Sequence, residues 1–149
     1  MAVPSNYALD PHKSLFYPFT VLMPAMASGA IASGSTSTTY IFHAPYACKL
    51  YGIDWVPSAT VSGTADNYTS FSAIHFLSAS GSTGGTTLGT VNMSGTATIY
   101  SGGYGVSLYN PTTPLSLAEG DKIGIRYTNT GLGFTAGMGV IQFSYVIGS

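Results

Sequence analysis

Strict alternation of side chains decides the fold of this chain in one stretch, Lys122-Ile123-Gly124-Ile125-Arg126-Tyr127-Thr128. Successive side chains of a strand point to opposite faces, so Ile123, Ile125 and Tyr127 would share one face. The intervening positions are small, polar or charged and would share the other. A period of two residues over this length predicts a strand with one buried and one wetter face, as in an antiparallel sheet.

The same signal recurs along most of the chain. Strands are predicted at residues 38–43, 46–56, 68–77, 86–93, 99–100, 106–109 and 140–147. Clusters rich in Gly, Pro, Ser and Asn separate them about every ten residues, and no window has the 3.6-residue period of an amphipathic helix. Seven to nine short strands with regular turns are typical of a β-sandwich or a closed barrel.

Alternation also assigns faces to individual side chains. In the strand that ends before Pro57 it predicts that Ile53 and Trp55 lie opposite Leu50. In the strand that precedes Pro45 it predicts that Tyr40 and Phe42 lie on the same face.

We therefore predict an all-β protein, an antiparallel β-sandwich with an extended N-terminal arm and most consistent with a jelly roll. An immunoglobulin-like Greek key is the alternative, but the chain lacks the pair of cysteines that flanks a tryptophan in that fold. Its single cysteine, Cys48, forms no internal disulfide, and a small hydrophobic core residue is its simplest role.

Charge is scarce. Among 149 residues there are four basic and five acidic side chains, a charged fraction of 6% and a net charge of −1. This fraction is roughly a quarter of the usual share. The absence of a basic patch argues against a nucleic-acid partner, and no stretch is apolar and long enough to span a membrane as a helix. Soluble surfaces use charge to resist association, so its scarcity favours a protein that works within an assembly.

The chain is predicted to divide into residues 1–37, an N-terminal arm with a small-residue linker, and residues 38–149, the β-sandwich domain. Residues 15–26 carry no charge, and two prolines interrupt them. Such a segment either contacts another protein or forms the first strand of the sandwich. The predicted partner contacts are Leu15, Phe16, Tyr17, Phe19, Met23 and Met26. The first six residues lack the pattern of a signal peptide, which predicts synthesis in the cytoplasm without export.

Residues with catalytic or metal-binding chemistry are few and scattered. His12, His43 and His75 are far apart in sequence, and a zinc or copper site would have to bring His43 and His75 together near Cys48. No nucleophile elbow or phosphate loop is present. We therefore predict no enzyme, no metal and no cofactor. A hydrolase stays as an alternative that would require carboxylates or histidines to cluster in the fold.

Three segments together resemble small virion proteins of tailed bacteriophages. They are Tyr17-Pro18-Phe19-Thr20-Val21, Ala44-Pro45-Tyr46-Ala47-Cys48-Lys49-Leu50-Tyr51-Gly52-Ile53-Asp54, and Leu115-Ser116-Leu117-Ala118-Glu119-Gly120-Asp121-Lys122-Ile123-Gly124-Ile125. The last is similar to the leucine-x-x-Gly-Asp turn that enters a strand in many jelly-roll modules.

This resemblance implies a capsid decoration (cement) protein, which is a non-enzymatic jelly roll, often a homotrimer, on the capsid surface of the virion. Such proteins bind the major capsid protein and clamp neighbouring subunits against internal pressure. The resemblance transfers no contact residue, so the arm contacts above rest on the apolar segment alone. The alternative is a receptor- or carbohydrate-binding β-sandwich module of a tail fibre or tail tip, with exposed aromatic side chains in the binding role.

Overall fold

The computed structural model describes residues 17–23, 33–57, 64–79, 84–94, 105–131 and 139–147, which contain strands and turns but no helix. The strands are β1 (Tyr17–Met23), β2 (Thr36–His43), β3 (Cys48–Pro57), β4 (Tyr68–Phe76), β5 (Thr86–Asn92), β6 (Val106–Tyr109), β7 (Leu115–Leu117), β8 (Lys122–Thr130) and β9 (Gly139–Ile147). The all-β class is therefore confirmed. Alternation missed β7, and the predicted strand at residues 99–100 lies outside the described residues.

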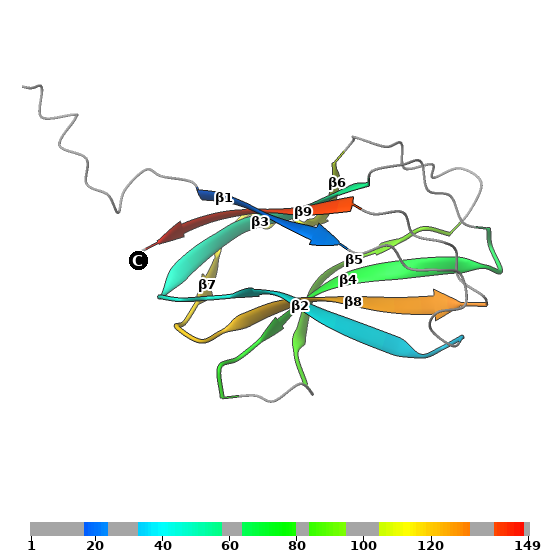
Figure 1. The fold of residues 1–149 in the computed structure, drawn as a ribbon, viewed down its shortest axis with the longest axis horizontal. Coiled ribbons are helices and arrows are strands. Elements are labelled where there is room, and N and C mark those ends of the chain that lie inside the picture. Colours follow the sequence, from blue (N-terminus) through cyan, green and yellow to red (C-terminus); the bar gives the residue numbers. More distant parts are fainter. Residues whose placement is uncertain are drawn as a thin grey trace, which may run out of the picture.

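Two antiparallel sheets form the sandwich. One has the order β1-β9-β3-β6, with β7 also paired to β3, and the other has the order β2-β8-β4-β5. The two sheets lie one above the other in Figure 1, with β1, β9 and β3 in one layer and β2, β8 and β4 in the other. The predicted antiparallel β-sandwich is confirmed.

Strand pairing is nested along the chain. The first strand pairs with the last, β1 with β9, and the second with the last but one, β2 with β8. Inside these, β3 pairs with both β6 and β7, and β4 pairs with β5 in a hairpin. Most of these contacts join residues far apart in sequence.

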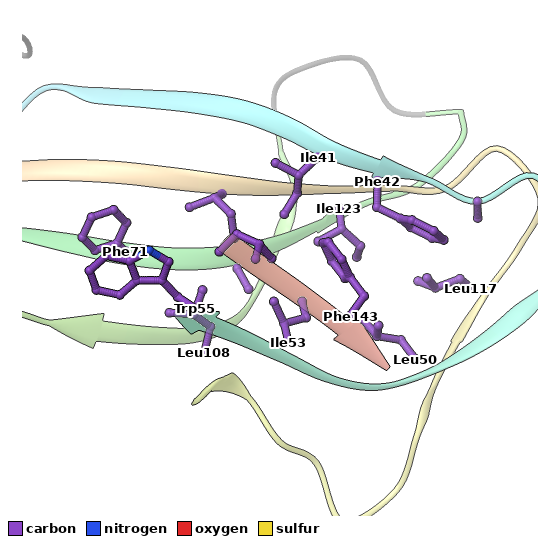
Figure 2. Close-up of a cluster of buried hydrophobic side chains, with 14 of the residues drawn as sticks. Ile41, Phe42, Leu50, Ile53, Trp55, Phe71, Leu108, Leu117, Ile123 and Phe143 are labelled. Atoms are coloured by element: carbon purple, nitrogen blue, oxygen red, sulfur yellow. The ribbon is translucent and has the colours of Figure 1, made fainter. Parts of the chain in front are cut away.

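The core fills the space between the two sheets. Trp55 on β3 stacks on Phe71 of β4, with ring centroids 5.0 Å apart, and Phe143 of β9 stacks on Phe42 of β2 at 5.6 Å. Figure 2 shows the rings of Trp55 and Phe71 against each other between the layers, with Ile53 beside them. Each fully buried large side chain contributes about 1.5–3 kcal/mol to folding, so these contacts hold the layers together.

Two β-bulges correct the predicted faces. The register of β3 against β9 shifts between Leu50 and Gly52, so Leu50 joins Trp55 in the core instead of lying opposite it. A second shift, between Tyr40 and Phe42 of β2, buries Phe42 and leaves Tyr40 44% exposed. Each bulge inserts one residue and thereby reverses the alternation on one side of it.

Part of the predicted N-terminal arm is a strand. The backbone of β1 runs along β9, with Tyr17 opposite Tyr145 and Met23 opposite Gly139, at the edge of its sheet (Figure 1). This is the first-strand alternative for residues 17–23. The linker expected up to residue 37 gives way to β2 at Thr36.

Candidate functional site

The edges of both sheets are free of charge. Within the described strands, Asp, Glu, Lys and Arg occur only on β3, at Lys49 and Asp54, and on β8, at Lys122 and Arg126. Both strands are central in their sheets. The strands at the sheet edges, β1, β6, β7, β2 and β5, contain none of these four residue types. The charged residues of the described strands therefore lie away from the sheet edges.

An edge strand presents unpaired backbone N–H and C=O groups, and proteins usually block such edges with charge, proline or a bulge. Here β1 has Pro18 near its start, β2, β5 and β6 contain bulges, and β7 has only 3 residues. Residues 19–23 of β1 contain neither proline nor charge, and their register against β9 is continuous. This part of β1 is thus the least protected of the described edges and a candidate surface for pairing with another chain.

Three of the predicted partner contacts, Tyr17, Phe19 and Met23, are positions of β1. Between them Thr20 is exposed. The other three, Leu15, Phe16 and Met26, lie outside the described residues. The structure therefore brings half of the predicted set onto one edge strand.

A buried carboxylate organises one end of the sandwich. Asp121, only 2% exposed, accepts hydrogen bonds from the Nε2 atom of His75 at 2.8 Å, the N–H of Ser78 at 2.8 Å and the N–H of Ala118 at 3.0 Å. We call these four residues, with Ala44 and Gly120, the Asp121 junction.

Backbone hydrogen bonds complete the junction. Ala44 donates to the carbonyl of Asp121 at 2.8 Å, and Gly120 donates to the carbonyl of Ala44 at 2.9 Å. Gly120 has φ of +86°, which residues with a side chain rarely adopt. Loops β2–β3, β4–β5 and β7–β8 are thereby fastened at one point. The Gly-Asp turn noted in the sequence is Gly120-Asp121, and its hydrogen bonds hold these loops together.

Burial by itself raises the pKa of the Asp121 carboxyl, but hydrogen bonds from His75, Ala118 and Ser78 and the charge of His75 outweigh it, so the net pKa is lowered. Burial and the negative charge of Asp121 raise the pKa of Cys48. The thiol is buried and stays protonated at neutral pH, which is the condition of an inert core residue and not of a nucleophile.

The junction does not assemble the metal site considered above. His75 bonds Asp121, whereas His43 is exposed at the end of β2. Within the described ranges no three residues among His, Cys, Asp and Glu gather closely enough to hold a metal ion. The hydrogen bonds of the junction hold the loops in place.

Two large apolar side chains stand exposed on the loops that the junction fastens. Tyr46 follows Ala44 by two residues and is 61% exposed, and Leu77 precedes Ser78 and is 58% exposed. Sequence reasoning did not single out either residue. The sequence predicted Tyr46 as the first residue of a strand and Leu77 as the last residue of another. The structure places both in loops, because β3 begins at Cys48 and β4 ends at Phe76.

A shallow groove of about 400 Å³ lies where β5 of one sheet meets β6 of the other. Its lining includes Leu88, Thr90, Ser107 and Tyr109. The two strands approach closely here, because a Cβ on Gly89 would lie 2.1 Å from the carbonyl oxygen of Leu108. Only glycine fits at this position.

No protein-family model matches this sequence, and neither a curated protein nor a solved structure is significantly similar to it. In the described ranges there is also no helix of sufficient length and hydropathy to cross a membrane.

Proposed function

We propose that this chain is a structural virion protein that binds the outer capsid lattice and reinforces contacts between major capsid subunits. The observation that carries the proposal is the absence of charge from all the described edge strands, with charge kept on β3 and β8. A protein that stays monomeric needs protected edges, whereas a protein that is covered by neighbours does not.

We infer a jelly roll from the nested strand pairs. In a jelly roll the first strand pairs with the last, the second with the last but one, and so on to a central hairpin. The pairs β1–β9, β2–β8, β3–β6 and β4–β5 have this order, with β7 as a continuation of the edge beside β3. The order supports the jelly roll over an immunoglobulin-like sandwich.

In the proposed mechanism, β1 pairs with a strand of a neighbouring molecule, either a major capsid protein or a second copy of this chain in a trimer. Each contact gains about 25 cal/mol per Å² of apolar surface removed from water, and many copies on one lattice act together. The proposal assigns the chain no catalytic step and no cofactor, since Asp121 and His75 are engaged in fastening loops.

The alternative function is a receptor- or carbohydrate-binding module of a tail fibre or tail tip. Its supporting observation is the exposure of Tyr40 and Tyr46, because aromatic rings on a rigid sheet or loop pack against the apolar faces of sugars.

Antibody labelling of particles that contain the chain separates the two functions. Electron microscopy of labelled virions is expected to find many copies spread over the head. Label confined to the tail would refute the decoration role and favour the attachment role.

A further inference from the structure

The outer face of the four-stranded sheet carries ordered rows of hydroxyl groups. The strand register aligns Thr38, Arg126, Ser72 and Thr90 across β2, β8, β4 and β5 in one row. The next row along the strands consists of Thr36, Thr128, Ser70 and Asn92. Four strands at their usual spacing make this face roughly 14 Å wide.

The rows are rich in hydrogen-bond donors. The hydroxyls of Ser72 and Thr90 are 2.7 Å apart and share one hydrogen, so the other stays available. Ser70 donates to Oδ1 of Asn92 at 2.7 Å, which leaves the Asn92 amide free to donate. Nε of Arg126 donates to Thr38 at 3.4 Å, while both terminal nitrogens of the guanidinium remain for a ligand.

An aromatic platform lies beside these rows. Tyr40 reaches across Gly124, which has no side chain, and its ring packs edge-on against Phe76 with centroids 5.1 Å apart. Phe76 is fully buried, but Tyr40 remains 44% exposed. Because Phe76 supports it, the Tyr40 ring is held in place.

The face is also positive. Lys122 and Arg126 lie on the same side of β8, so it holds two of the four basic residues of the chain. No Asp or Glu occurs in β2, β8, β4 or β5. Among the described residues, no carboxylate pairs with Arg126. An uncompensated guanidinium amid hydroxyl groups is complementary to a carboxylate or sulfate group.

We propose that this face binds an acidic oligosaccharide. A sugar ring packs on Tyr40, Arg126 pairs with the acidic group, and Ser72, Thr90 and Asn92 bond the ring hydroxyls. Two cations on a face about four strands wide are too few for tracking a nucleic-acid backbone, which excludes the main competing anion. The inference does not depend on the capsid role, since it does not use the edge of β1. It deepens the alternative function, carbohydrate binding, by giving that function a face and a class of ligand.

Isothermal titration with three acidic probes tests the site: oligogalacturonate, sialyllactose and a heparin-derived oligosaccharide. Maltohexaose is the neutral control. At least one acidic probe is expected to bind. Arg126→Gln should weaken the affinity for that probe by about tenfold or more, which is the usual effect of losing one charge-assisted hydrogen bond. Tyr40→Ser should weaken it as well. Lys49→Gln, which removes a cation from the other sheet, should bind like the native chain.

Thermal melts of each variant establish that it is folded. Failure of all three acidic probes to bind the native chain would overturn the proposal, and so would unchanged affinity in folded Arg126→Gln. Equal affinity for maltohexaose would overturn the role of charge. An oligonucleotide that binds as tightly as the best acidic sugar would overturn the assignment to carbohydrate.

Discussion

At the scale of single residues, Asp121 connects several segments of the fold. Its carboxylate is buried and accepts three hydrogen bonds, which join strand β4 and loop β4–β5 to loop β7–β8. The backbone carbonyl of Asp121 accepts from Ala44 and thereby adds loop β2–β3. A buried carboxylate is costly unless its acceptor capacity is used, so the junction must be complete to be stabilising. The turn at Gly120 and the imidazole of His75 are part of that completeness.

Replacing Asp121 with Asn should destabilise the protein by about 2–4 kcal/mol, because the amide retains one acceptor oxygen and loses the charge. Urea unfolding, followed by the fluorescence of Trp55, measures the change. The exposed Asp66→Asn provides the matched control and should be within about 0.5 kcal/mol of the native chain. Similar stabilities for the two variants would contradict the role of the junction.

The lowered pKa of Asp121 makes stability depend on pH. The unfolded chain, with an ordinary carboxyl pKa of about 3.9, takes up the proton before the folded chain does. The stabilisation is therefore complete above that pH and is lost as pH falls through the lower folded pKa. We expect the difference in unfolding free energy between the native chain and Asp121→Asn to have its full value above about pH 5 and to shrink as the pH falls below about 4. A difference that stays constant over this range would disprove the assignment.

At the scale of elements, local pattern predicted the strands well and their faces less well. Alternation is a property of neighbouring residues, so the predicted strands of β2, β3, β4 and β8 lie within two residues of the observed ones. The position of a β-bulge depends on how a strand pairs with its partner strand. No local sequence signal therefore marked the bulges beside Leu50 and Tyr40. For the same reason His75 could not be paired with Asp121 from sequence, since 46 residues separate them.

Because β5 and β6 lie so close together, we predict that any side chain at Gly89 destabilises the fold. Gly89→Ala would place Cβ against the Leu108 carbonyl and force these strands apart, with a cost of about 2 kcal/mol or more. Gly52→Ala is the control, because its Cβ would meet the nearest backbone atom at an ordinary 3.5 Å. Thermal unfolding of both variants should show a lower midpoint for Gly89→Ala. Equal midpoints would refute the tight contact.

If β1 is an assembly edge, a charge on it should weaken self-association. Thr20→Lys places a cation at an exposed position of β1, and its mass by light scattering should fall from an oligomer toward a monomer. Ala65→Lys, in an exposed loop, should keep the native mass. A native chain that is already monomeric, or a Thr20→Lys variant of unchanged mass, would contradict self-association through β1.

At the scale of the whole molecule, the structure shows which parts of the described surface lack charged residues. The scarcity of charge predicts a protein that works within an assembly. Ser and Thr side chains on the wet faces of strands are a second reason for low charge, because they keep a surface hydrated without charge. The strand order shows where on the molecule each of these two reasons for low charge applies. Rows of hydroxyl groups lie on the outer face of the four-stranded sheet, whereas the described edge strands contain no Asp, Glu, Lys or Arg. Strand order depends on contacts between distant residues, and it was this order that identified which strands are edges.

Binding to capsids tests the central proposal most directly. Purified protein is added to heads that lack it, and the bound copies are counted after co-sedimentation. We predict saturation at a number of copies that matches the repeats of the capsid lattice, with weaker binding by Thr20→Lys than by Ala65→Lys. Absence of binding to heads, or saturation at only a few copies per particle, would contradict the proposal.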